Sequence, residues 1–256
     1  MISSHLRGGL GNLLFQISAA YALALRNNNE AKFNLSSNNY DRPKAETYKN
    51  NLFKNIQIIN NIDYLYTYIE TKFNYVEIPF KNDMILSGCF QSEKYFIDFK
   101  KEIYELLYPI DVANNLKEKY GDILKDSVSL HVRRGDYLKL QNYHPCPNIN
   151  YYNNAINTIK KEKNINKILI FSDDINWCKS QFICEEYVFI EGQKDYEDII
   201  LMSLCDNNII ANSSFSWWGS WLNQNNDKKV IAPKLWFGEL VNNDWNDIYF
   251  EKIIIL

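Results

Sequence analysis

The second half of the chain alternates short apolar runs with longer amphipathic runs. The short runs have the length of buried strands, and the longer runs have the spacing of helices. Strands and helices that alternate in this way form parallel sheets covered by helices. The sequence therefore predicts an α/β fold, with strands at 128–132, 167–171, 187–190, 208–211 and 230–232 and helices at 151–163, 176–182, 196–205 and 215–223.

The first half has a less regular pattern. It opens with a short apolar segment, a glycine turn and an alanine-rich helix, and it closes with a polar helix that ends before Gly121. Ser92 is a plausible N-cap for a helix that follows it. We predict strands at 1–6, 64–69 and 85–90, helices at 13–26, 92–107 and 111–120, and loops in the rest of 40–85.

This change of pattern predicts two domains. The first domain is 1–125, the second is 126–235, and 236–256 is a tail that returns to the first domain. A chain of 256 residues with 46% hydrophobic residues is long enough to build two cores.

Composition narrows the class of protein. The 28 basic and 31 acidic side chains give a net charge of −3, which does not favour nucleic acid as a partner. Five cysteines without a C-x-x-C pair and three histidines predict neither a disulfide framework nor a zinc site. With no leader-like segment and no apolar run near the roughly 18 residues of a membrane span, we expect a cytoplasmic protein, or one peripheral on the inner face of a membrane.

A first candidate site follows the strand at 128–132. This strand brings His131, Arg133 and Arg134 to one edge of the sheet and stops at the turn Gly135-Asp136. Two adjacent guanidinium groups favour an anion such as phosphate, which fits their planar fork. The alternative is that one arginine pairs with Asp136 as structural support while the other lies in water.

A second polar motif, Ser172-Asp173-Asp174, follows the next strand. Two carboxylates could bind a metal ion, but the chain has no D-x-D spacing. One aspartate could instead cap the helix that begins directly behind it. A carboxylate here could also accept the paired N–H donors of a base such as guanine.

A third motif, Asn212-Ser213-Ser214, opens a helix that carries Phe215 and three tryptophans. Hydroxyl and backbone N–H groups gather there at the positive end of the helix dipole, which favours an anion. The alternative interpretation makes either serine only an N-cap and the tryptophans core residues.

The N-terminal glycine turn offers a further place for phosphate. Gly9 and Gly11 lie between a strand and a helix, where backbone N–H groups can approach an anion. The dinucleotide fingerprint G-x-G-x-x-G is incomplete, because Leu14 occupies its third glycine position, so a nicotinamide or flavin site is not expected. The glycines could also serve only a tight turn.

These motifs follow strands of parallel sheets, where ligands bind beyond the carboxyl ends of the strands. Together they predict a nucleoside diphosphate that is bound without an obligatory metal ion.

Four segments resemble, in order, the motifs of the α-1,2-fucosyltransferases, glycosyltransferase family 11. Leu13 stands where that family usually has glutamine. The segments are Gly8-Gly9-Leu10-Gly11-Asn12, His131-Val132-Arg133-Arg134-Gly135-Asp136-Tyr137, Phe171-Ser172-Asp173-Asp174 and Ser213-Ser214-Phe215-Ser216-Trp217-Trp218-Gly219-Ser220-Trp221-Leu222.

The resemblance implies a GT-B-like fold of two Rossmann-like units facing across a cleft. It also implies metal-independent, inverting transfer of L-fucose from GDP-β-L-fucose to a hydroxyl group, commonly the 2-OH of a terminal β-galactose. The acceptor would be an oligosaccharide or glycolipid in surface polysaccharide biosynthesis. No cofactor is implied, because GDP-fucose is a substrate.

By the same resemblance, Arg133 contacts the diphosphate, Asp173 the guanine, and Ser213, Ser214 and Phe215 the leaving phosphate. Asn12 lies near the join of the domains and is a catalytic candidate. Gly9, Gly11, His131 and Arg134 complete the predicted donor site.

In the mechanism expected from these residues, Arg133 stabilises the negative charge that develops on the departing phosphate. Asp136 and His144 are the two candidates for the base. The sequence does not choose between them. Asp136 could instead hold an arginine in place, and His144 could instead only contact the acceptor. The alternatives to this function are another fucosyl linkage or a non-catalytic sugar-binding or adhesion module that uses Arg134-Gly135-Asp136.

Overall fold

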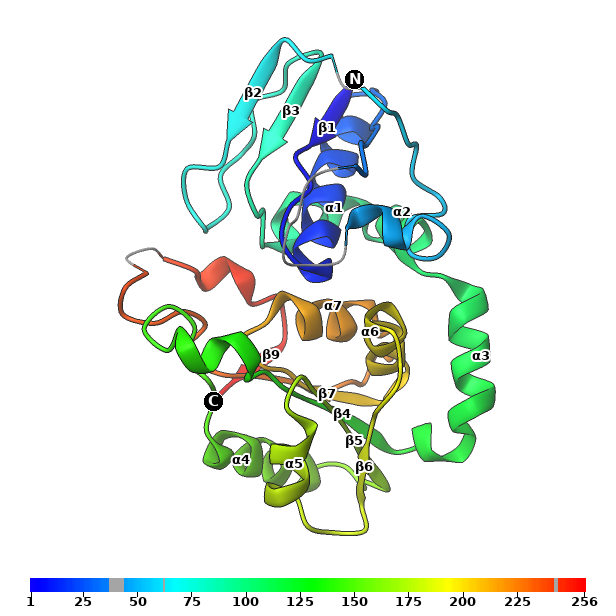
Figure 1. Ribbon diagram of the computed structural model, residues 1–256, viewed down its shortest axis with the longest axis vertical. Coiled ribbons are helices and arrows are strands. Elements are labelled where there is room, and N and C mark those ends of the chain that lie inside the picture. Colours follow the sequence, from blue (N-terminus) through cyan, green and yellow to red (C-terminus); the bar gives the residue numbers. More distant parts are fainter. Residues whose placement is uncertain (37–43, 62, 242–243) are drawn as a thin grey trace. The chain divides into compact units, whose positions relative to one another are not determined.

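The computed structural model describes residues 1–36, 44–61, 63–241 and 244–256 (Figure 1). The chain divides into two units, Met1–Pro109 with Asn243–Phe250, and Ile110–Asn242 with Glu251–Leu256. The division falls before α3 (Ile110–Tyr120), earlier than the predicted position near residue 125. The reason is that α3 packs against α6 (Asp195–Leu204) of the second unit.

The second unit is built on a parallel sheet with the strand order β6-β5-β4-β7-β8-β9. The chain starts in the middle, runs outward to β6, crosses back to β7 and then runs outward to β9. This doubly wound order has its switch point between β4 and β7. The strands are β4 (Ser127–Val132), β5 (Lys167–Ser172), β6 (Tyr187–Phe189), β7 (Asn207–Ile209), β8 (Val230–Ala232) and β9 (Ile253–Ile255).

Helices cover both faces of this sheet (Figure 1). One face carries α4 (Ile149–Lys160) and α5 (Ile175–Gln181), whose apolar side chains form a core with the strands. The other face carries α6 and α7 (Ser214–Leu222), and Trp217, Trp218 and Trp221 of α7 are fully buried. The α/β prediction for this half is confirmed, and β4–β8 and α4–α7 lie close to their predicted ranges.

The C-terminal segment, predicted to be one tail that returns to the first domain, is divided between the two units. Asn243–Phe250 belongs to the first unit, whereas Glu251–Leu256 belongs to the second, where β9 pairs in parallel with β8. Three consecutive isoleucines favour a strand, but so short a run does not stand out in the sequence. Residues 242–243 lie outside the described residues.

The first unit contains a smaller parallel sheet with the order β1-β3-β2. Its strands are β1 (Ile2–Ser4), β2 (Tyr66–Ile69) and β3 (Met84–Ser87), and its helices are α1 (Leu10–Arg26), which packs against β1, and α2 (Lys100–Leu107). Parallel bridges extend the sheet beyond β1, joining Ile2 to Ala31 and Phe33 to Ile58.

Two predictions in the first unit are wrong in part. The helix predicted at 92–107 is α only from Lys100, because the backbone at Phe96 leaves the helical region and separates the 3-10 turns Glu93–Tyr95 and Ile97–Phe99. The strand predicted at 85–90 ends at Ser87, because the next N–H groups bond to the side chain of Glu70. Ser92 does act as a cap, accepting from the N–H of Lys94 at 3.3 Å.

Candidate functional site

Arg133 lies directly after β4, at the carboxyl end of the sheet and beside the switch point. Its Nη1 lies 2.8 Å from Oδ2 of Asp173, and its Nη2 pairs with Oδ1 of Asp136. The side chain of Arg133 is 22% exposed, so both ion pairs are partly shielded from water. A guanidinium has five N–H groups. The two pairs therefore fix its plane and leave N–H groups for another anion, and Asp136 holds the arginine in place.

Arg134 joins the end of β4 to the start of α5. Its Nε lies 3.0 Å from Oδ2 of Asp174, and its Cζ lies 4.0 Å from the centre of the Trp177 ring. Asp174 also caps α5, because its Oδ1 accepts from the N–H of Trp177 at 3.3 Å. The sequence interpretation that left the second arginine in water is therefore wrong, while the helix cap predicted in this motif is confirmed.

Asp173 lies between these two arginines. Its Oδ1 accepts from the backbone N–H of Arg134 at 2.9 Å, and its Oδ2 pairs with Arg133. A Cβ atom on Gly135 would lie 2.5 Å from the same Oδ2, so only glycine fits there without moving the carboxylate. Each carboxylate oxygen can accept a second hydrogen bond.

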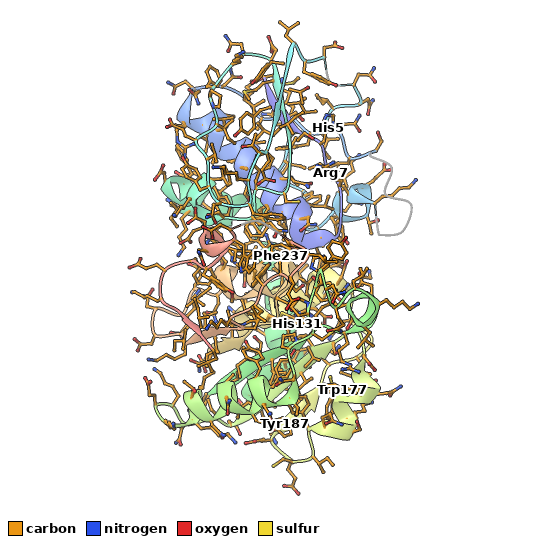
Figure 2. The ribbon with its side chains drawn as sticks, turned by 90° about the vertical axis from the view of Figure 1, so that its left-hand side faces the viewer. His5, Arg7, His131, Trp177, Tyr187 and Phe237 are labelled. Carbon is orange, nitrogen blue, oxygen red and sulfur yellow. The ribbon has the colours of Figure 1, made fainter. Side chains whose placement is uncertain are left out.

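His131, labelled in Figure 2, is a buried residue of β4. Its Nδ1 lies 2.8 Å from Oγ of Ser216, which also accepts from the N–H of Ala211 at 3.3 Å. Burial lowers the pKa of His131 to about 3, and the charge of Arg133 acts in the same direction. The imidazole is therefore neutral at physiological pH. Its contact with Ser216 connects β4 to α7, on the two sides of the switch point.

The N-terminus of α7 forms the other side of the switch point. Ser213 is its N-cap, and the Ser213 hydroxyl accepts from the N–H of Phe215 at 3.4 Å. The ring of Phe215 lies 5.5 Å from that of His131. Asn212 is buried and donates to the carbonyl groups of Pro145 and Trp236 at 2.9 Å and 3.0 Å. Ser214 is the first residue of the helix, so the predicted serines lie at its positive end.

A layer of rings lies next to Arg133. The ring of Tyr137 is 5.0 Å from Cζ of Arg133 and stacks on His144 with centroids 4.6 Å apart. His144 in turn lies 5.6 Å from Phe237, which Figure 2 labels. The hydroxyl of Tyr137 donates to the carbonyl of Asn212 at 3.3 Å. His144 thus belongs to the same side-chain cluster as Arg133 and Asp136, through Tyr137.

The remaining predicted residues belong to the first unit. Gly9 is the N-cap of α1, with no side-chain cap, and Gly11 is buried in the first turn. Gly8 has a φ of +89°, and a Cβ there would lie 2.6 Å from Nδ2 of Asn12, so this turn needs glycine. Oδ1 of Asn12 accepts from Nε2 of Gln91 at 2.8 Å, which ties this turn to the loop after β3.

The charges around Arg133 do not add up to a cationic patch. Two guanidinium groups face three carboxylates, those of Asp136, Asp173 and Asp174. Anion recognition here would rest on directed N–H groups and not on net charge.

Within the described ranges, no group of three His, Cys, Asp or Glu side chains is placed to hold a metal ion. Among the helices of those ranges, none is long and apolar enough to cross a membrane.

Ser216, Tyr137 and Trp177 have no role assigned from the sequence, although the first two lie within the quoted motifs. They contact His131, His144 and Arg134 respectively. Ser216 follows the cap Ser213 by three residues, so both lie on one helix face. That spacing is a signal for a polar partner at the start of a helix. The ring contacts with Tyr137 and Trp177 have no comparable signal in the sequence.

The doubly wound sheet with a candidate anion site at its switch point belongs to the GT-B-like class of glycosyltransferase folds. NodZ, an α-1,6-fucosyltransferase, is similar in structure with a TM-score of 0.55 and 13% sequence identity, over 86% of this chain and 92% of NodZ. A second structure of NodZ, from Bradyrhizobium, gives a TM-score of 0.54 at 12% identity over 86% and 92% of the two chains. The predicted α/β, GT-B-like fold class is confirmed.

The sequence identifies the family. Residues 2–252 match Glycosyl transferase family 11, and the chain belongs to this family. It is 32% identical to an α-1,2-colitosyltransferase of Escherichia coli over 93% of this chain and 92% of the relative. It is 31% identical to the O-antigen biosynthesis glycosyltransferase WbnK of Escherichia coli, over 91% and 94%. A putative galactoside 2-α-L-fucosyltransferase of Caenorhabditis elegans is 25% identical over 85% and 67%. The predicted family is confirmed, and the protein is a glycosyltransferase.

Proposed function

We propose that the protein transfers L-fucose from GDP-β-L-fucose to a hydroxyl group of a glycan, the 2-OH of a terminal β-galactose, with inversion and without a bound metal ion. The relatives named for 2-α-L-fucosyl and α-1,2-colitosyl transfer support the linkage. A NodZ crystal soaked with GDP-fucose supports the donor class. The galactose acceptor is the one named for the relative from Caenorhabditis elegans.

The observation that carries this proposal is the fixed guanidinium of Arg133 at the switch point. Ligands of doubly wound sheets bind beyond the carboxyl ends of the strands at this point. Arg133 is held there by Asp136 and Asp173 with N–H groups to spare. A guanidinium with a fixed plane pairs well with two oxygens of a diphosphate.

The start of α7 supplies the second part of the donor site. The hydroxyls of Ser213 and Ser214 and the positive end of the helix dipole favour a phosphate oxygen. His131, neutral and held by Ser216, adds a pH-independent polar group between this helix and Arg133. Arg134 keeps the loop after β4 in place through its contacts with Asp174 and Trp177. Asp173 accepts hydrogen bonds from the guanine edge with its remaining lone pairs.

The transfer breaks the bond between C1 of fucose and the phosphate oxygen, and the electron pair of that bond leaves with GDP. Negative charge grows on the phosphate while positive charge grows on C1. Arg133 and the N–H groups of α7 stabilise the departing charge, the role that a divalent cation has in other transferases. The acceptor oxygen attacks C1 from the opposite side, so the β-linked donor gives an α-linked product.

Asp136 is a positioning residue in this scheme, because its ion pair with Arg133 fixes the guanidinium. His144 is held by ring contacts with Tyr137 and Phe237. Because Tyr137 connects His144 to Arg133, we assign His144 to contact with the acceptor. Gly9 and Gly11 stay predicted contacts of the donor, and Asn12 stays a predicted catalytic residue.

One observation favours a second donor. The α-1,2-colitosyltransferase is 32% identical to this chain over nearly its whole length. Colitose lacks one hydroxyl of fucose, so a pocket that does not hydrogen-bond this hydroxyl would accept both sugars.

The test is to incubate the protein with GDP-fucose or GDP-colitose, with and without lactose, in the presence of EDTA. We expect lactose-dependent release of GDP with one of these donors, and a product whose NMR spectrum shows an α-linkage to the 2-OH of galactose. Absence of lactose-dependent GDP release with EDTA and its return with Mg²⁺ would contradict the metal-independent mechanism. A product linked at another hydroxyl would contradict the proposed linkage.

A further inference from the structure

The hydroxyl of Ser216 has three polar neighbours in the second unit. Ser216 lies in the first turn of α7 and is buried. Its Oγ lies 2.8 Å from Nδ1 of His131 and accepts from the N–H of Ala211 at 3.3 Å. The third neighbour is the carbonyl oxygen of Ser213, at 3.5 Å. A hydroxyl has one proton and two lone pairs, so these distances decide where the proton points.

The protons at this contact can be arranged in two ways. If Nδ1 of His131 carries a proton, it donates to Oγ of Ser216, and the hydroxyl has only the carbonyl of Ser213 to donate to. The distance of 3.5 Å is longer than the about 2.5–3.0 Å of an O–H···O bond, and a badly paired proton in a buried site is unfavourable. If Nδ1 is bare, the hydroxyl donates to it at 2.8 Å and every group is well paired. The geometry therefore favours a bare Nδ1.

The proton of His131 then lies on Nε2, on the other side of the ring from Ser216. The neutral imidazole carries one proton, and within the described residues Nε2 has no hydrogen-bond partner. Arg133 follows His131 by two residues, so both side chains leave the chain on the same side. The ring of Phe215, at the start of α7, lies 5.5 Å from that of His131. The Nε2–H group is thus a donor beside both parts of the proposed donor site.

We propose that Ser216 is a positioning residue for the donor diphosphate: its hydroxyl donates to Nδ1 of His131 and fixes the tautomer whose Nε2–H donates to a diphosphate oxygen. This inference rests on the proposed function, because it assigns a residue to the same donor site. No proton is transferred at His131. The imidazole stays neutral, and its hydrogen bond strengthens as negative charge grows on the departing phosphate.

The tautomer decides whether His131 attracts or repels an anion. Burial lowers the pKa of His131 to about 3, so the ring does not gain a second proton near neutral pH. With the proton on Nε2, the ring presents an N–H donor to a phosphate oxygen. With the proton on Nδ1, it presents a lone pair, which repels the same oxygen. Ser216 therefore acts on the diphosphate through His131, without contacting it.

The test compares Ser216→Ala with the matched control Ser220→Ala. Ser220 lies one turn further along α7, is equally buried, and its hydroxyl donates to the carbonyl of Trp217 at 2.8 Å. The first readout is ¹⁵N NMR of the imidazole groups, because the chain has only three histidines and His131→Asn identifies the signals of His131. We expect a bare Nδ1 and a protonated Nε2 in the unchanged protein and in Ser220→Ala. Ser216→Ala should show both tautomers.

The second readout is GDP affinity, measured by calorimetry with EDTA. In Ser216→Ala it should fall about three- to tenfold, the effect of one neutral hydrogen bond, while Ser220→Ala binds GDP like the unchanged protein. In His131→Gln the amide N–H reaches the position of Nε2, whereas in His131→Asn it reaches only that of Nδ1. His131→Gln should therefore bind GDP more tightly than His131→Asn. Urea unfolding of both serine variants shows whether they lose similar stability.

A protonated Nδ1 in the unchanged protein would overturn the inference. So would equal GDP affinities of Ser216→Ala and Ser220→Ala, because the contact with His131 would then be only structural. These readouts need no acceptor and no turnover. If the tautomer and the GDP affinities are as expected but the unchanged protein transfers no sugar to lactose, the proposed function is contradicted and the role of Ser216 in diphosphate binding is supported.

Discussion

Replacing Arg133 by lysine tests whether a fixed guanidinium stabilises the leaving phosphate. Lysine keeps the positive charge but presents one compact ammonium group. It cannot bridge Asp136 and Asp173 and also present a planar pair of N–H groups to a diphosphate. Loss of one such preorganised donor costs about 3 kcal/mol, which is roughly a hundredfold in rate. We therefore expect kcat to fall about a hundredfold.

Stability should change little in the same variant. The side chains of Arg133 and Asp173 are 22% and 27% exposed, so their ion pair is only partly shielded from water, and lysine keeps the positive charge beside the carboxylates. Fully exposed ion pairs contribute about 0–1 kcal/mol, and the loss from Arg133→Lys should stay near that range. The assay is the GDP-release assay with lactose, together with urea unfolding of both proteins. A kcat within about threefold of the unchanged protein, a difference of under 1 kcal/mol, would refute the assignment. An equal loss of stability and activity would show that Arg133 is only structural.

Three further predictions concern the same unit. In Gly135→Ala the new Cβ would displace the carboxylate of Asp173, found 2.5 Å from that position, so donor KM should rise while the unfolding free energy changes little. The pKa of His131 is about 3 when folded and 6.5 in its ordinary state, so the unfolded chain takes up the proton first as the pH falls. This costs about 2 kcal/mol of stability near pH 5, and His131→Asn should remove that part of the acid sensitivity in thermal melts. Trp217 is fully buried, and Trp217→Ala should lower the unfolding free energy by about 3–5 kcal/mol in urea; a loss under 1 kcal/mol would contradict its place in the core.

Local features of the site could be predicted from the sequence. The motif from His131 to Asp136 places two arginines at the end of a strand and an acid three residues after the first. The ion pair of Arg133 with Asp136 and the cap at Ser213 follow from such short-range spacing. The alternation of strands and helices after Ser127 predicts the parallel sheet for the same reason, since each element is read from its own residues.

Long-range features could not be predicted. The bond between His131 and Ser216 joins residues 85 positions apart, and no local pattern indicates it. The N–H groups that donate to the carboxylate of Glu70 belong to Cys89 and Phe90, 19 and 20 positions further along the chain. β9 adds to the sheet only because β8 offers it an edge. Helix α3 joins the second unit through its packing on α6. In each case tertiary contacts decide, and a single local window does not contain them.

The proposed function requires the second unit to bind a nucleoside diphosphate through Arg133 and the start of α7 without a metal ion. Calorimetric titration of the protein with GDP in the presence of EDTA measures this binding, with Arg133→Ala titrated beside it. We expect GDP binding that EDTA leaves unchanged and that weakens at least about tenfold in Arg133→Ala, the equivalent of 1.4 kcal/mol. GDP binding that requires Mg²⁺, or that is equally tight in both proteins, would contradict it.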